Sequence, residues 1–343
     1  MTSVTHTARL RAADISYPVL VGSLGALSAI LFLVSLVVGY VPLDPVAAVS
    51  DIVAGRDSVG ALVMVELRLP RALLGAMVGF SLGATGAALQ GLLRNPLADP
   101  GVIGVSSAAA LGAVIAFYSG LAGFLSIGLA LGGLSGAGLA TALLLLLARQ
   151  GAGTTALILS GVAIGSLAGA LTALALNLSP SPYAVMEVVF WLMGSLADRS
   201  LDHVLLAAPF MAVGWILLLG ASRALDGLSL GEETARSLGF DVMRLRIRIV
   251  VASAFAVGSA VAVSGAIGFV GLVVPHILRP LVGHQPGPLV LVSGLGGAVL
   301  TLAADILVRV LPTHPELKLG VVTAIIGAPF LFSLLWRMRR DLE

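Results

Sequence analysis

The sequence of 343 residues is 58% hydrophobic and only 10% charged, whereas soluble domains carry roughly 25% charged residues. So much apolar surface excludes a water-soluble globular protein and predicts an integral membrane protein. The absence of cysteine excludes disulfides, thiol catalysis and thiolate metal sites, and a net charge of +2 with scattered arginines excludes a basic patch for nucleic acid.

Ten apolar runs are long enough to predict membrane-spanning helices, because a helix needs about 20 residues to cross a bilayer. They lie near residues 18–40, 70–92, 98–120, 124–148, 154–178, 202–222, 243–264, 266–283, 287–310 and 317–337. We therefore expect an all-α polytopic membrane protein in which residues 1–343 form a single transmembrane domain. The boundary between the seventh and eighth runs is the least defined, since its glycines and Pro275 permit a sharp reversal or a broken helix.

Glycine recurs at every fourth position in three of these runs. The positions are Gly75, Gly79 and Gly83, then Gly128, Gly132 and Gly136, then Gly161, Gly165 and Gly169. Small residues at this spacing let helix backbones approach closely in lipid. The pattern predicts a compact bundle of many helices, with a role in a hinge or a pathway as the alternative for any one glycine.

The stretch "YAVMEVVFWLMGSL", residues 183–196, is apolar but too short to span, and it contains Glu187. It predicts a short helix that dips in from one face without crossing. Ten spans place both termini on one side of the membrane. With a cytoplasmic N-terminus, 13 of the 19 Lys and Arg residues lie in cytoplasmic segments and 6 on the other side. This excess predicts cytoplasmic N- and C-termini and a cytoplasmic segment 227–241.

That segment, "GLSLGEETARSLGFD", interrupts the apolar sequence with charged residues. Ser229 and Glu232 fit the S-x-x-E capping box, and the acidic residues would occupy the first helical turn. Gly239 can end the helix in the left-handed conformation. The pattern predicts a short amphipathic helix over about residues 228–240. The local signals leave two interpretations open, a helix lying on the membrane surface and a helix that docks into a soluble partner.

No catalytic or metal-binding motif stands out in the sequence. Lysine occurs only at Lys318, so the phosphate-binding loop of P-loop ATPases is absent. Asp305 and Arg309 lie one helical turn apart and predict an ion pair, with proton coupling as the alternative. A secondary carrier or channel acting alone also stays an alternative, but such carriers usually show ionisable residues near the midplane. Their scarcity here favours an external source of energy.

Several long motifs resemble the permease subunits of bacterial ABC importers for ferric siderophores, haem and cobalamin. They are "LRLPRALLGAMVGFSLGATGAALQGLLRNPLADPGVIGVSSAAALGA" (67–113), "LSLGEETARSLGF", "SGAIGFVGLVVPHILRPLVG" (264–283) and "ADILVR…ELKLGVVTAIIGAPFLFSLLWR" (304–337). They occur in the family's order and cover essentially the whole chain. The resemblance implies a type II importer architecture with ten spans in the bacterial inner membrane.

The resemblance also implies partners. Such permeases form a homodimer with the pathway along its axis, two ATP-binding subunits dock from the cytoplasm, and one periplasmic binding protein delivers the substrate. The chain itself would be no enzyme and would bind no cofactor, because ATP–Mg belongs to the partner ATPase. No metal ligand and no nucleic-acid partner is implied.

Specific residues follow from the matched motifs. Contact with the ATPase is implied for Leu230, Gly231, Glu232, Glu233, Ala235, Arg236, Leu238 and Gly239. Docking of the binding protein is implied for Arg68, Arg71 and Arg309, with interfacial anchoring as the alternative for the first two. Thr154 and Thr155 match the cytoplasmic gate, with helix capping as the alternative. Haem, a ferric siderophore and cobalamin remain equally compatible substrates, although the segment 177–200 is expected to face the outer vestibule.

Overall fold

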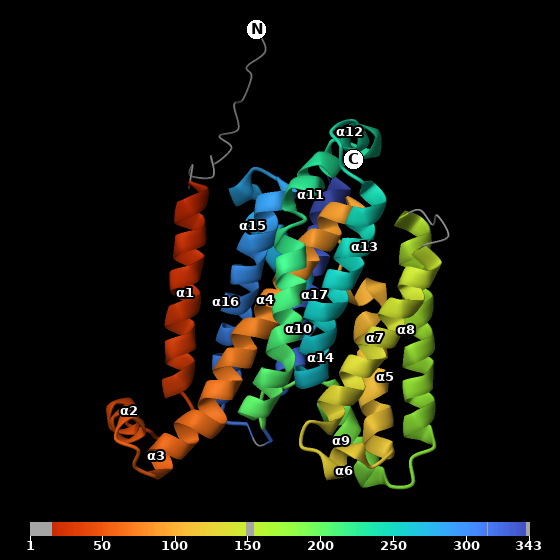
Figure 1. Ribbon diagram of the computed structural model, residues 1–343. Coiled ribbons are helices and arrows are strands. Elements are labelled where there is room, and N and C mark those ends of the chain that lie inside the picture. Colours follow the sequence, from red (N-terminus) through yellow and green to blue (C-terminus); the bar gives the residue numbers. More distant parts are fainter. Residues whose placement is uncertain (1–15, 149–153, 314, 341–343) are drawn as a thin grey trace.

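The computed structural model describes residues 16–148, 154–313 and 315–340, and every regular element within them is a helix (Figure 1). The helices are α1 (Tyr17–Val37), α2 (Pro45–Val53), α3 (Val59–Leu62), α4 (Leu69–Leu93), α5 (Val105–Tyr118), α6 (Leu121–Phe124), α7 (Gly128–Ala148), α8 (Thr154–Asn177), α9 (Pro182–Leu192), α10 (Leu201–Leu219), α11 (Ser222–Ser229), α12 (Glu232–Ser237), α13 (Val242–Ser253), α14 (Ser259–Ser264), α15 (Val270–Leu278), α16 (Pro286–Val310) and α17 (Leu319–Arg340). A π-helical turn, Val63–Arg68, joins α3 to α4, and another, Ala254–Gly258, joins α13 to α14. The 3₁₀ turns Pro100–Ile103 and Arg279–Val282 precede α5 and follow α15.

Each of the ten predicted runs contains a helix, and seven of the described helices are long and apolar enough to cross a membrane. These seven are Tyr17–Val37, Val59–Leu93, Gly128–Leu147, Ala156–Asn177, Leu201–Leu219, Val242–Ser264 and Pro286–Val310. The other three runs form the shorter helices Val105–Tyr118, Val270–Val282 and Leu319–Leu334. The all-α membrane architecture is confirmed, and the count of ten spans stays a prediction.

The predicted interruption between the seventh and eighth runs is a break in the helix. α14 ends at Ser264, and the chain passes through Gly265 (φ 71°) and Phe269 (φ 67°) before α15 begins. Gly265 adopts this backbone conformation without the steric cost that a Cβ would bring. Pro275 lies inside α15, so the glycine segment makes the reversal and the proline does not.

α4 forms the axis of the bundle, with α16, α15 and α10 packed around it (Figure 1). A Cβ at Gly79 or Gly83 would overlap the backbone carbonyl of Gly297 or Ser293 on α16, so these helices touch backbone to backbone. The indole of Trp215 on α10 donates a hydrogen bond of 2.9 Å to the hydroxyl of Ser81 on α4. The close packing predicted from the glycine spacing is therefore confirmed for this pair of helices.

α5 and α7 meet in the same way, because a Cβ at Gly136 would overlap the carbonyl of Ala108. The pattern does not hold at every glycine. Gly169, on the exposed side of α8, has no neighbouring atom within 4 Å of an added Cβ. Spacing alone therefore identified the packed faces of α4 and α7 but overstated that of α8.

We expect Gly83→Ala to lower the free energy of unfolding by about 1–3 kcal/mol, because the methyl group must push α4 away from α16. Gly138→Ala is the matched control. Gly138 is exposed on α7 with open space around its Cα, and alanine is more favourable than glycine in a helix by about 0.8–1.0 kcal/mol. Thermal unfolding of both variants in detergent micelles checks this, and equal losses in the two variants would contradict it.

Candidate functional site

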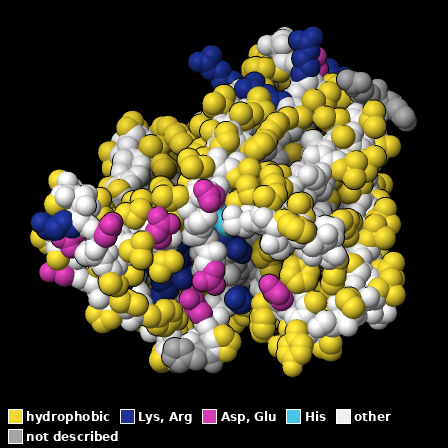
Figure 2. Space-filling view, turned by 60° about the horizontal axis from the view of Figure 1, so that its bottom comes forward, with side chains coloured by type: hydrophobic (Ala, Val, Ile, Leu, Met, Phe, Trp, Pro, Cys, Tyr) yellow, Lys and Arg dark blue, Asp and Glu magenta, His cyan; other side chains and the backbone are white. Residues whose placement is uncertain are grey.

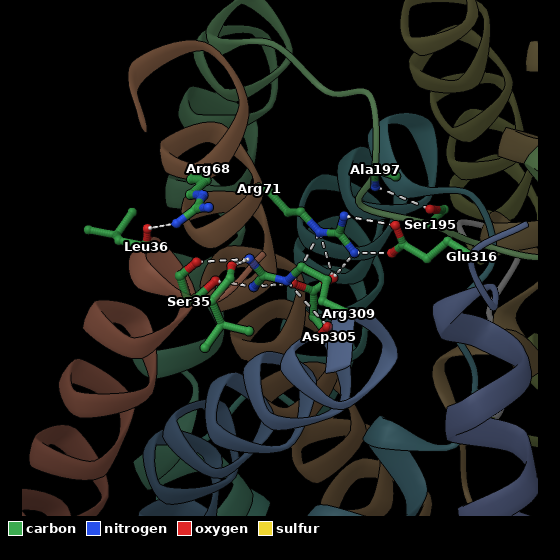
Figure 3. A network of polar contacts seen from close by, with 10 residues as sticks. Ser35, Leu36, Arg68, Arg71, Ser195, Ala197, Asp305, Arg309 and Glu316 are labelled. Carbon is green, nitrogen blue, oxygen red and sulfur yellow. Dashed lines mark hydrogen bonds and ion pairs between the residues drawn. The ribbon is translucent and has the colours of Figure 1, made fainter. Parts of the chain in front are cut away.

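The predicted functional residues lie at two opposite ends of the bundle. α12 stands at one end, and the start of α4 and the end of α16 lie at the other (Figure 1). At this second end, Arg68 ends the π-helical turn before α4, Arg71 lies in the first turn of α4, and Arg309 lies in the last turn of α16. Arg309 is therefore brought into one cluster with Arg68 and Arg71, from which it is far apart in the sequence (Figure 3).

Asp305 is the centre of this cluster and is 1% exposed. Its carboxylate lies 2.7 Å from the guanidinium of Arg309 and 2.8 Å from that of Arg71. The predicted ion pair between Asp305 and Arg309 is confirmed. Glu316 supplies a second carboxylate to Arg71, so two cations and two anions balance in this group. Buried charges persist in proteins when they are paired and hydrogen-bonded in this way.

The guanidinium groups of Arg68 and Arg309 also donate hydrogen bonds to backbone carbonyls at and just after the end of α1. Arg68 is 5% exposed and donates to the carbonyls of Leu36 (3.0 Å), Val37 and Val41. Arg309 donates to the carbonyls of Ser35 (2.8 Å) and Val38 (2.9 Å). These bonds satisfy carbonyl groups that the end of a helix leaves without intrahelical partners. Both arginines therefore hold the end of α1 against α4 and α16.

The three arginines line a hollow of about 390 Å³. Besides the three arginines, its charged lining comprises Arg199, Lys318, Asp198 and Glu316. Figure 2 shows basic and acidic side chains gathered at this end among apolar ones. Arg199, in the loop between α9 and α10, has a buried Nε without a hydrogen-bond partner, and burial lowers the pKa of its guanidinium while Asp198 opposes that shift. The hollow carries more positive than negative side chains and suits an anionic group.

The docking role predicted for Arg68, Arg71 and Arg309 stays a prediction. The structure shows how these arginines are arranged and what they bind within the chain. The three arginines converge as the motif implies, and each already has partners within the chain. A partner's carboxylate would reach them through the hollow, which Arg199 and Lys318 also line. Glu316 and the double role of Asp305 were missed by the sequence analysis, since no local pattern links residues 71, 305 and 316.

At the other end, α12 is a helix of six residues that exposes most of its surface. Ala235 is fully buried, whereas Leu230 and Leu238, on either side of the helix, are 66% and 58% exposed. Glu233 is also exposed. The helix therefore offers exposed apolar and charged side chains that a partner could contact.

The predicted capping box was wrong. Ser229 is the last residue of α11, and its hydroxyl donates to the carbonyl of Asp226 (2.7 Å). α12 instead begins after Gly231, whose φ of 111° is accessible to glycine and reverses the chain between the two helices. The predicted end at Gly239 is confirmed, with φ 86° and a hydrogen bond of 3.0 Å from the Phe240 amide to the Ala235 carbonyl.

Polar contacts connect this end to the bundle. Glu232 forms an ion pair with Arg246 on α13, whose side chain is 11% exposed, and a weaker one of 3.6 Å with Arg236. The amide of Gly287, at the start of α16, donates a hydrogen bond of 2.7 Å to the Asp226 carboxylate on α11. These contacts join α12 to α13 and α11 to α16.

The remaining predicted elements are only partly described. α8 begins at Thr154, but the side chains of Thr154 and Thr155 lie outside the described part of the chain, so the gate stays a prediction. The short helix predicted at 183–196 is present as α9, Pro182–Leu192. The loop after it carries Asp198 and Arg199 into the wall of the hollow.

Comparison with known proteins gives consistent matches over nearly the whole chain. The model of the FecCD transport family matches residues 27–337. The vitamin B12 import system permease protein BtuC of Vibrio cholerae is 44% identical over 276 residues, 79% of this chain and 82% of that protein. The hemin transport system permease protein HmuU of Yersinia pestis is 38% identical over 283 residues, 81% and 84% of the two chains. A solved metal-chelate type ABC transporter in an inward-facing conformation aligns with a TM-score of 0.80 at 33% identity, over 94% of this chain and 99% of that one.

Proposed function

Because the chain belongs to the FecCD transport family, we propose that it is the membrane-spanning permease subunit of an ATP-driven importer. The substrate is an iron complex, either a ferric siderophore or haem, or it is cobalamin, which a periplasmic binding protein delivers for passage to the cytoplasm. The match to a permease family over residues 27–337 carries this proposal. As a permease it is a component of a transport system in the inner membrane and no enzyme, and ATP–Mg is bound by the partner ATPase.

The orientation completes the proposal. The excess of Lys and Arg predicts cytoplasmic termini, which places α12 in the cytoplasm and the arginine cluster at the periplasmic face. Two permease copies form the dimer, and two ATP-binding subunits contact α12 and its flanking residues from Leu230 to Gly239. One binding protein docks over the hollow at Arg68, Arg71 and Arg309. Thr154 and Thr155 close the cytoplasmic side of the pathway at the start of α8.

α16 supports a route between the two ends. Its first turn is bonded to α11 through Gly287 and Asp226, and its last turn holds Arg309 and Asp305. An α-helix of 25 residues is about 38 Å long, so α16 connects the two ends directly. Force applied by the ATPase to α12 can therefore reach the binding-protein end through one helix that packs backbone to backbone on α4.

Reconstitution in liposomes tests the function. We expect uptake of one of the three substrate classes only when the permease, the ATPase subunits, the binding protein and ATP–Mg are all present. A titration of the binding protein with haem, ferric siderophores and cobalamin selects the substrate beforehand. Transport by the purified permease without ATP and partners would contradict the proposal and favour a secondary carrier or channel.

A further inference from the structure

The segment between α1 and α4 forms a projection at the end opposite α12 (Figure 1). α2 packs against α3, and Ala48 is the one buried residue of α2. Asp44 caps α2 by accepting hydrogen bonds from the amides of Val46 (2.9 Å) and Ala47 (3.2 Å). The projection is therefore a defined structure and not a frayed connection, although little of it touches the bundle.

One side of α2 is apolar and exposed. Val46, Val49 and Val53 follow the i, i+3, i+7 spacing of a single helix face and are 78%, 50% and 83% exposed. Ile52 borders them and is 41% exposed. Val59 and Leu62 of α3 add two more exposed side chains, at 75% and 63%. Six apolar side chains in a segment of 18 residues are therefore exposed, which in water would be unfavourable.

The charged residues of the projection line a hollow to which Val46, Val49 and Val53 do not contribute. Asp51 and Arg56 form an ion pair of 2.7 Å, and with Asp57 and Glu66 they line an open hollow of about 490 Å³ that Ile52, Val59 and Leu62 also line. Three carboxylates against one guanidinium give this polar side a negative balance. Attraction to anionic lipid headgroups is therefore not what positions the segment, and any membrane contact must come from the apolar side chains.

The position of α1 indicates where this apolar side lies relative to the membrane. α1 qualifies by length and composition as a membrane-spanning helix, and Ile30, Leu33 and Val37 are 56%, 61% and 46% exposed along it. These side chains continue to its last residue, after which seven residues, 38–44, lead to α2. Figure 1 shows α2 at the level of the lower end of α1, so the exposed valines of α2 lie where the apolar surface of α1 ends.

We propose that α2 and α3 lie in the boundary between headgroups and acyl chains of the leaflet opposite α12, with Val46, Val49 and Val53 in the lipid. Short amphipathic helices bind membranes in this way, with the apolar face buried about 5–10 Å below the headgroups. α3 continues without interruption through Val63–Arg68 into α4. Lipid that holds α3 thereby also fixes the start of the helix that carries Arg68 and Arg71. This inference needs neither the proposed substrate nor the proposed orientation.

The chain has no cysteine, so single cysteines can report on depth in the full protein. We would label Val49→Cys and Val53→Cys with bimane in nanodiscs of phosphatidylcholine, with Ile30→Cys as the lipid control and Asp57→Cys as the aqueous control. All four positions are exposed, so the substitutions leave the fold intact. We expect brominated lipid to remove most of the emission at residues 30, 49 and 53, and iodide to remove it at residue 57.

Two results would overturn the proposal. If iodide and not brominated lipid quenches the labels at residues 49 and 53, the apolar side faces water. It would then be a surface for a soluble partner and not for lipid. Protection from both quenchers would show that a second copy of the permease covers it. Quenching by brominated lipid should also persist in 1 M salt. The Debye length there is about 3 Å, so salt screens attraction between surface charges but leaves an apolar contact with lipid in place. Loss of quenching in salt would contradict the apolar mechanism.

Discussion

In the Glu232→Arg, Glu233→Arg double variant, ATP-dependent uptake falls to the level of liposomes that lack the permease, while the permease still inserts and elutes as a folded protein. The two changes act by different routes. Glu233 is exposed on α12, so its reversal alters the charge that a partner meets. Glu232 pairs with the largely buried Arg246, so an arginine there places two guanidinium groups together.

Uptake, co-purification and ATP hydrolysis separate the causes. Loss of co-purification with the ATPase means that assembly fails, whereas hydrolysis without uptake means that the complex forms but α12 no longer transmits the movement. Glu233→Arg alone tests the surface, since it leaves the Glu232–Arg246 pair in place. Asp57→Arg, at the other end of the bundle, is the control for a charge reversal as such. Normal uptake in the double variant would refute the role of α12.

In the same region, local sequence patterns predicted one end of a helix correctly and the other end wrongly. Charge and glycine placement located α12 and its end at Gly239, because both are decided within one or two turns of chain. The start was misplaced because α11 precedes α12 directly and retains Ser229 in its own last turn. A serine three residues before a glutamate predicts a cap only where the chain enters the helix from a non-helical segment, and here it comes from another helix.

At the opposite end, the three arginines and the pair of Asp305 with Arg309 were predicted from the sequence, whereas Glu316 and the arrangement of the site were not. Asp305 and Arg309 were predicted to pair because they are one turn apart on one helix. The bonds from Arg71 to Asp305 and Glu316 join α4 to α16 and to the loop after it, so they depend on how helices pack in three dimensions. Glycine spacing predicted that α4 packs closely on another helix, but it contains no information on which helix or in which register.

The docking of the binding protein gives the second large expected effect. In the Arg68→Glu, Arg71→Glu double variant, we expect affinity for the binding protein in nanodiscs to fall roughly tenfold or more, since close charge pairs across an interface contribute about 1.5–7 kcal/mol. The variant turns two cations of the hollow into anions beside Asp305 and Glu316. It therefore repels an acidic partner, but it also disrupts the internal cluster.

Asp305→Asn separates these two effects. It removes the carboxylate that Arg71 and Arg309 share, which should lower the free energy of unfolding by about 3–5 kcal/mol, because two guanidinium groups then lose a buried partner. The hollow nevertheless becomes more positive, so affinity for an acidic partner should be kept or increased. Equal losses of affinity in Asp305→Asn and the arginine variant would show that the cluster acts only by holding α1, α4 and α16 together. A loss confined to the arginine variant means that the cations themselves receive the binding protein.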